Sequence, residues 1–182
     1  MSTREGLVSA VVSRLRAHAA DLWLAGFIVA LDQVTKPLVR AMIPAYESIT
    51  IVPGLLNFTH VQNTGAAFGI LNLTDFPFKT PILITVHLIA LVSIGFYSLS
   101  LPLNQRLVRT GLAFILGGAV GNLIDRLRNG YVLDFVDVYW RQYHFWAFNV
   151  ADAAITIGVA IIILDLLFTR GPARSEGTPT PQ

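Results

Sequence analysis

Two short motifs in the second half of the chain place an aspartate beside a hydrophobic segment. Asp134 lies in Val-Leu-Asp-Phe at 132–135, and Asp152 ends Phe-Asn-Val-Ala-Asp at 148–152. Burying an ionisable group among the apolar residues of a membrane costs free energy, so such a group by default indicates a functional site. Two carboxylates in one low-dielectric site share a proton, so one can activate water while the other polarises a peptide carbonyl. This acid–base chemistry requires neither a metal nor a covalent nucleophile.

A third motif, Gly-Gly-Ala-Val-Gly-Asn-Leu-Ile-Asp-Arg at 117–126, ends the preceding hydrophobic segment. Asn122 and Asp125 share a helix face because they are three residues apart, and so do Asn149 and Asp152. We expect both clusters at the same depth, with Asp134 in a loop between them, so that Asp134 and Asp152 face one another. Asp125 also suits a structural ion pair with its neighbour Arg126.

Composition favours a polytopic membrane protein. Of the 182 residues, 54% are hydrophobic and 13% are charged, whereas a soluble domain is about 25% charged. The mean hydropathy is +0.61. The net charge of +2 gives no basic field for nucleic acid. The chain has no cysteine, which excludes disulfides, thiolate zinc sites and a cysteine nucleophile.

Four hydrophobic segments come close to the ~20 residues needed to span a bilayer. They lie at about 22–43, 81–101, 107–124 and 148–168. The first is too long for a signal-peptide core and is expected to be retained. The third is rich in small residues that let a neighbouring helix approach closely. The tails, 1–20 and 169–182, lack a core-forming pattern, and the second is expected to be disordered.

Basic residues predict the orientation, because cytoplasmic loops carry more of them. If both termini share one side, that side holds Arg4, Arg14, Arg16, Arg106, Arg109, Arg170 and Arg174. The other side holds Lys79, Arg126, Arg128 and Arg141, with Lys36 and Arg40 in the outer half of the first span. The moderate bias predicts cytoplasmic termini.

The two long connections then lie outside. In the first, over 44–77, a β-branched run, a Pro-Gly turn and an alternating run predict a small β-sheet on the membrane surface. The second, over 127–147, is crowded with aromatic residues, which favour the headgroup region. From the residues alone, a plain interfacial belt is the simplest interpretation of these aromatics.

The remaining polar groups receive simpler interpretations. Asp32 and Lys36, one helical turn apart, are either a neutralised pair that tethers helix to sheet or part of the site. Asp137 is interpreted as a solvated loop carboxylate, and Asp165 as a group that reaches the cytoplasmic interface or caps packing.

The histidines are not assigned to chemistry. His87 is interpreted as a hydrogen-bonded packing residue, and His60 and His144 as surface groups. No His/Asp/Glu spacing matches a zinc motif, and no Gly-rich loop matches a phosphate cradle.

Taken together, five blocks resemble the signatures of bacterial lipoprotein signal peptidase (signal peptidase II), in that family's order. Besides the three motifs above, they are Leu-Asp-Gln-Val-Thr-Lys at 31–36 and Asn-Thr-Gly-Ala-Ala-Phe-Gly at 63–69. The resemblance covers roughly 20–168 and leaves the tails outside.

The resemblance implies a mainly α membrane protein: a four-transmembrane-helix bundle with a small extracytoplasmic β-cradle, in the bacterial inner membrane. It implies an aspartic endopeptidase that cleaves a prolipoprotein just before its diacylglyceryl-modified cysteine, with no metal or cofactor. It implies a mobile helix or loop in the second connection, 127–147, which is expected to close over a bound peptide. Globomycin-type inhibitors are implied to block the aspartate pair. We expect a monomer surrounded by membrane lipids.

The resemblance also assigns roles to residues. The catalytic pair falls on Asp134 and Asp152. Positions that contact substrate or inhibitor, or that support the aspartates, fall on Asn63, Gly65, Asn122, Asp125, Arg126, Asn149, Asp32 and Lys36.

Two rival functions remain on the residues alone. A small proton-coupled transporter component would use the intramembrane aspartates as a relay, but these aspartates bunch at one depth. A membrane scaffold would use the glycine run as an oligomer face, but it leaves Asn149 and Asp152 unexplained.

Overall fold

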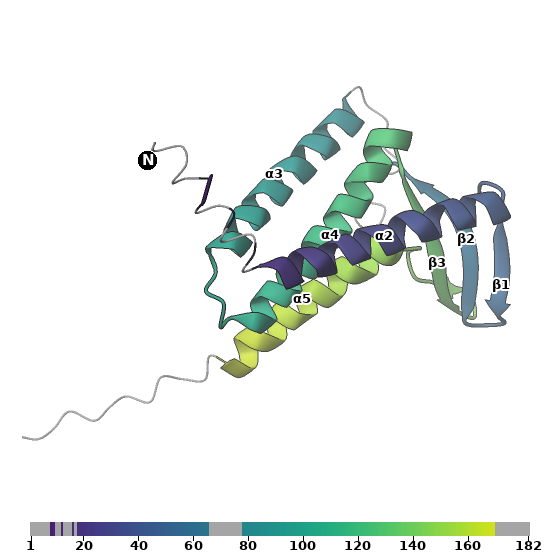
Figure 1. The fold of residues 1–182 in the computed structure, drawn as a ribbon. Coiled ribbons are helices and arrows are strands. Elements are labelled where there is room, and N and C mark those ends of the chain that lie inside the picture. Colours follow the sequence, from purple (N-terminus) through teal and green to yellow (C-terminus); the bar gives the residue numbers. More distant parts are fainter. Residues whose placement is uncertain (1–7, 10–11, 13–15, 17, 66–77, 170–182) are drawn as a thin grey trace, which may run out of the picture.

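Four long helices and one four-stranded antiparallel sheet make up the protein (Figure 1). The structure, a computed structural model, describes residues 8–9, 12, 16, 18–65 and 78–169. The helices are α2 (Ala19–Met42), α3 (Lys79–Ser100), α4 (Arg106–Asn129) and α5 (Val150–Thr169). All four are long and apolar enough to cross a membrane. The predicted fold class, a four-helix membrane bundle with a small β-sheet, is confirmed.

Helix α4 is the centre of the bundle, because it packs against α2, α3 and α5. Figure 1 shows α3 on one side of α4 and the α2–α5 pair on the other. Small residues permit this packing: a Cβ atom added to Gly111 would lie 2.7 Å from a side-chain carbon of Ile162, and one added to Gly117 would lie 2.9 Å from the carbonyl oxygen of Ala25. The glycines of α4 therefore serve packing between helices of one chain.

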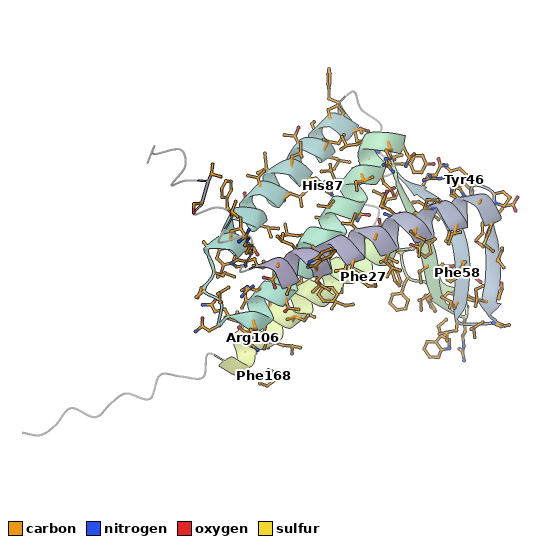
Figure 2. All side chains as sticks on the ribbon, viewed as in Figure 1. Phe27, Tyr46, Phe58, His87, Arg106 and Phe168 are labelled. Atoms are coloured by element: carbon orange, nitrogen blue, oxygen red, sulfur yellow. The ribbon has the colours of Figure 1, made fainter. Side chains whose placement is uncertain are left out.

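The bundle exposes apolar side chains and buries charged ones, which is the reverse of the distribution in a soluble protein. On α2 the side chains of Trp23 and Phe27 are 80% and 64% exposed, and Figure 2 shows Phe27 on the outside of the bundle. The same helix buries Asp32 and Lys36. Lipid-facing apolar residues around a polar interior are expected of a helix whose charged groups serve a site.

The sheet lies at one end of the bundle, hereafter the sheet end (Figure 1). Its strands are β1 (Ser48–Val52), β2 (Leu56–Asn63), β3 (Val132–Trp140) and β4 (Tyr143–His144), in the order β1-β2-β3-β4. Strand β1 pairs with β2 as a hairpin around Gly54, whose φ of +80° suits glycine. The strands predicted in the first connection are therefore present.

The second connection differs from the expectation of a loop or helix. Helix α4 continues to Asn129 and ends at Gly130, whose φ is +77°, and the chain then enters β3, which pairs antiparallel with β2. Leu133 and Phe135, two residues apart, pack on Val39 of α2 and on Ile43, which directly follows that helix. This two-residue period indicates a strand, but aspartates and clustered aromatics obscured it in the sequence.

Most of the predicted tail 1–20 and all but one residue of the tail 169–182 lie outside the described residues, as does the second half of the Asn-Thr-Gly-Ala-Ala-Phe-Gly block. The predicted disorder of 169–182 therefore stays a prediction.

Candidate active site

The structure brings the two aspartates to the sheet end from different elements. Asp134 is on β3, opposite Val61 of β2, and Asp152 is in the first turn of α5. Asp134 is 3% exposed. An isolated bridge between Val136 and Phe148 brings β3 close to the start of α5. Asp134 thus lies on a strand, rather than in the loop expected from the sequence.

Asparagine side chains hold Asp134. The Nδ2 atom of Asn63 donates to its Oδ2 atom at 2.9 Å, and the Nδ2 atom of Asn149 donates to its Oδ1 atom at 2.7 Å. The two donors come from β2 and from the start of α5, so each oxygen is fixed from a different side. Because a donor holds each oxygen, the Asp134 side chain cannot rotate freely, and its carboxyl group is oriented in advance for proton transfer.

Asp152 is held by an equivalent set. The Nδ2 atom of Asn122 donates to its Oδ1 atom at 2.8 Å, and the backbone N–H of Asn149 donates to its Oδ2 atom at 3.3 Å. Asn149 thus contacts both aspartates and is fully buried. The N–H of Asp152 in turn donates to Oδ1 of Asn149 at 3.0 Å.

The surroundings of Asp134 favour its neutral form. Burial raises the pKa of the Asp134 carboxyl to about 7, and the negative charge of Asp152 adds to the rise. Hydrogen bonds from Asn63 and Asn149 and the charge of Lys36 oppose it but do not cancel it. A carboxyl that titrates near neutrality beside a second carboxylate is a functional-site signature.

A buried charge cluster supports the aspartates from behind. The Nζ atom of Lys36 lies 2.8 Å from Oδ2 of Asp32, 3.0 Å from Oδ2 of Asp125 and 3.1 Å from Oδ1 of Asn122. Lys36 and Asp32 are 1% and 0% exposed. The Lys36 ammonium requires the oxygen of Asn122 to face it, so the amide nitrogen of Asn122 faces Asp152.

The start of α5 is anchored to α2 and α4. Oδ1 of Asp32 accepts the N–H of Ala151 at 3.0 Å, which satisfies one of the free donors of the helix N-terminus. A Cβ atom added to Gly121 would lie 2.6 Å from Oδ2 of Asp32, and one added to Gly118 would overlap the carbonyl oxygen of Ala151. The close approach of α4 at these two glycines therefore determines where Asp152 sits.

Arg126 and Gly65 form a second contact group beside the aspartates. The Nη2 atom of Arg126 donates to the carbonyl oxygen of Gly65 at 2.6 Å, and the N–H of Gly65 donates to Oδ1 of Asn63 at 2.9 Å. Asn63 therefore uses its nitrogen for Asp134 and its oxygen for Gly65. All ten residues proposed from the sequence are connected through these contacts.

Several simpler interpretations change. Asp125 pairs with Lys36 and accepts the N–H of Leu133 at 3.2 Å, so a pair with Arg126 is not its role. Asp137 is buried, and its Oδ2 atom accepts from Asn57 at 3.0 Å; the expectation of a solvated carboxylate was wrong because this residue lies on a strand that the sequence did not indicate.

The expectations for the histidines have different outcomes. His60 is buried, with Nδ1 2.7 Å from the carbonyl oxygen of Ile43, so the prediction of a surface group was wrong. His144 is largely exposed, as expected, and lies 2.9 Å from Asp137. The Nδ1 atom of His87 lies 2.8 Å from the carbonyl oxygen of Leu83, in its own helix. That contact agrees with a packing role.

Sequence reasoning missed a charge cluster at the opposite end of the bundle. Asp21 accepts from Nε of Arg109 at 2.9 Å, and Nδ1 of His18 lies 3.2 Å from Asp21. His18 and Arg109 are buried. Asp21 and Arg109 are 88 positions apart in the sequence, so no local spacing indicated that they form a pair.

Comparisons with known proteins agree with this architecture. The family described as signal peptidase (SPase) II matches residues 24–168. The lipoprotein signal peptidase of Geobacter metallireducens is 47% identical over 137 residues, covering 75% of this chain and 83% of the relative. That of Alteromonas mediterranea is 42% identical over 158 residues, covering 85% and 84%.

Solved structures give the same result. One, described as a bacterial membrane enzyme, superposes with a TM-score of 0.76 at 32% identity and covers 88% of this chain and 95% of its own. A second of the same description has a TM-score of 0.72 at 27% identity. The chain therefore belongs to the signal peptidase II family and is a membrane aspartic peptidase with lipoprotein signal peptidase function.

Proposed function

We propose that Asp134 and Asp152 form the catalytic dyad and that the enzyme hydrolyses the peptide bond just before a diacylglyceryl-modified cysteine of a prolipoprotein. The observation that carries this proposal is the double role of Asn149. Its side-chain amide donates to Asp134 at 2.7 Å, and its oxygen accepts the N–H of Asp152 at 3.0 Å. One buried side chain thereby couples the two carboxyl groups.

Peptide hydrolysis by such a pair proceeds in balanced proton steps. The ionised aspartate takes a proton from water as the water oxygen attacks the carbonyl carbon, and the protonated aspartate gives its proton to the carbonyl oxygen. The tetrahedral intermediate then collapses, the C–N bond breaks, and the amine leaves with the proton first taken from water. One hydroxyl group of the intermediate returns its proton to the aspartate that protonated the carbonyl oxygen, which regenerates the starting pair.

The location of the dyad suits a lipid-modified substrate. Asp152 lies in the first turn of α5, at the end of a membrane span, and Asp134 lies in the adjoining sheet. A substrate whose acyl chains stay in the bilayer presents its scissile bond at that level. The backbone carbonyls of a helical signal segment are hydrogen-bonded, so the segment has to unwind before it is cleaved.

The orientation follows from the same placement. We assign both termini to the cytoplasm and the sheet end to the outer side, because more arginines lie on the terminal side. The cysteine-free chain allows a direct test: Gln142→Cys, between β3 and β4, should react with an impermeant maleimide in intact cells, and Asn104→Cys, between α3 and α4, should not. The reverse labelling pattern would overturn the assignment.

A cleavage assay tests the substrate. Purified enzyme receives a diacylglyceryl-modified prolipoprotein and its unmodified twin, with and without globomycin, and mass spectrometry locates the cut. We expect globomycin-sensitive cleavage before the lipidated cysteine and no cleavage of the twin. Equal cleavage of both substrates would refute the lipid requirement, and a cut elsewhere would refute the assigned bond.

A further inference from the structure

The two carboxyl groups of the dyad have equal numbers of hydrogen-bond donors but unequal surroundings. Asp134 accepts from Asn63 and Asn149, and Asp152 accepts from Asn122 and the backbone of Asn149. A count of donors therefore does not tell which group carries the shared proton. The elements that present the two groups do distinguish them.

Asp152 belongs to a capping box at the start of α5. The carbonyl oxygen of Asn149 accepts the N–H of Ala153 at 3.1 Å, which is the first bond of the helix and makes Asn149 the N-cap. The side chain of Asn149 accepts the N–H of Asp152, and the side chain of Asp152 accepts the N–H of Asn149. In a capping box each side chain satisfies a free backbone donor.

The terminus of α5 favours a negative charge on Asp152, and burial of that carboxyl group opposes it. The N-terminus of a helix carries a partial positive charge that stabilises carboxylates in the first turn, and Asp152 is the third residue of α5, which is 20 residues long. Asp32 reaches the same helix end through the N–H of Ala151. Its charge is compensated by Lys36, whose Nζ atom lies 2.8 Å away.

Asp134 has no such support. It lies in the third position of the nine-residue strand β3, and strands have only small net dipoles. Its two donors are neutral amide groups, and it is nine-tenths buried. Burial, followed by the charge of Asp152, raises the pKa of Asp134 to about 7.

The other charges around the dyad nearly balance. Lys36 and Asp32 face it from α2, and Arg126 and Asp125 face it from α4. Two cations and two anions leave the dyad with one negative charge of its own when it holds one proton. The placement of that proton is then decided by the local difference between strand and helix terminus.

We infer that Asp134 holds the shared proton in the resting enzyme and that Asp152 is the carboxylate, so that Asp152 takes the proton from water and Asp134 protonates the substrate carbonyl. This assignment rests on the proposed dyad. It gives the capping box of α5 a chemical role, because the helix start then supports the group that must be ionised before water can attack.

The test compares the two groups one at a time. The Asp134→Asn and Asp152→Asn variants are labelled with ¹³C at the aspartate carboxyl carbons, and the NMR chemical shifts are followed against pH in detergent. Asp137→Asn is the control, because it removes a carboxyl signal outside the site. Each isosteric variant leaves one member of the dyad. We expect Asp134 in Asp152→Asn to titrate at a higher pH than Asp152 in Asp134→Asn.

The reverse order, or identical titrations, would overturn the assignment while leaving the dyad in place. A second comparison uses variants that retain both aspartates: Asn63→Ala removes a donor of Asp134, and Asn122→Ala removes a donor of Asp152. The titration near neutral pH should move upward in Asn63→Ala more than in Asn122→Ala, and the opposite ranking would contradict us. Cleavage by Asp134→Asn or Asp152→Asn would instead refute the proposed function.

Discussion

The amide nitrogen of Asn149 lies 2.7 Å from Oδ1 of Asp134, and this contact joins strand β3 to the start of α5. The same side chain caps α5 by accepting the N–H of Asp152. The capping function and the link to Asp134 use different atoms, so substitutions can separate them.

We expect Asn149→Ser to keep the cap and lose the link, because a serine hydroxyl accepts the N–H but is too short to reach Asp134. Cleavage should fall by ~10²-fold or more. Thermal stability should fall in both Asn149→Ser and Asn149→Ala, because both lose the bonds from the Asn149 amide nitrogen to the Leu133 carbonyl and to Asn122 at 3.3 Å. It should fall less in Asn149→Ser, which keeps the cap. Asn149→Ala should lose the cap as well, at about 1 kcal/mol. Normal cleavage by Asn149→Ser would show that the link has no part in catalysis.

The contact of α4 with the start of α5 leads to a second prediction. In Gly118→Ala the added methyl group overlaps the carbonyl oxygen of Ala151 and approaches Ile155 to 2.8 Å. We expect a stability loss of roughly 1–3 kcal/mol and reduced cleavage, because α5 and Asp152 are displaced. Gly95→Ala in α3 is the matched control, since nothing lies within 4 Å of its added Cβ. Equal denaturation midpoints for the two variants would argue against the packing constraint.

Lys36 provides a third prediction. Lys36→Met leaves Asp32 and Asp125 as buried unpaired charges, and loss of one partner from a buried pair costs roughly 3–5 kcal/mol. Asp125→Asn keeps the Lys36–Asp32 pair and should be milder, with a loss of roughly 1–3 kcal/mol and residual cleavage above that of the dyad variants. Denaturation and cleavage rates measured side by side check the ranking. A complete loss of activity in well-folded Asp125→Asn would reopen the choice of dyad.

The titration of Asp134 predicts the alkaline limb of the pH profile. Its pKa of about 7 means that the proton needed by the substrate carbonyl is lost above neutrality. The value of kcat/KM should therefore fall as pH rises through about 7. A rate that stays constant through that region would count against a protonated Asp134.

The same group makes stability depend on pH. The unfolded aspartate has a pKa of about 3.9, so between pH 4 and 7 the folded state holds a proton that the unfolded state has lost. Stability from Asp134 is fully present below pH 4 and declines by at most about 1.4 kcal/mol per pH unit up to about 7. The denaturation midpoint of Asp134→Asn should depend less on pH over that range than that of the unsubstituted enzyme.

Local sequence patterns were sufficient to predict the helices and the β1–β2 hairpin. Apolar runs of membrane-spanning length marked all four spans, and the turn at Gly54 marked the hairpin. Strand β3 was not predicted, because Asp134 and Asp137 interrupt its apolar alternation. Its partner β2 is 71 residues away at the contact between Asn63 and Asp134, and single-sequence periodicity carries no signal of such pairing.

The supporting cluster was only partly predictable. Motif resemblance identified Asp32, Lys36 and Asn122 as supporting residues, whereas the residues alone left open whether Asp32 and Lys36 were a tether or part of the site. In the structure Lys36 contacts Asn122, 86 residues away, and Asn122 contacts Asp152, so the pair is joined to the candidate site. The buried Asp21–Arg109 pair at the other end had no motif and no local spacing, and only tertiary packing revealed it.

The most direct test of the central claim is cleavage of a lipidated prolipoprotein by Asp134→Asn and Asp152→Asn, with Asp137→Asn as the matched control on the same strand as Asp134. Each dyad variant should remain folded and lose at least ~10²–10⁴-fold in rate, while Asp137→Asn retains activity. Substantial cleavage by either folded dyad variant would contradict the assignment of Asp134 and Asp152 as the catalytic pair.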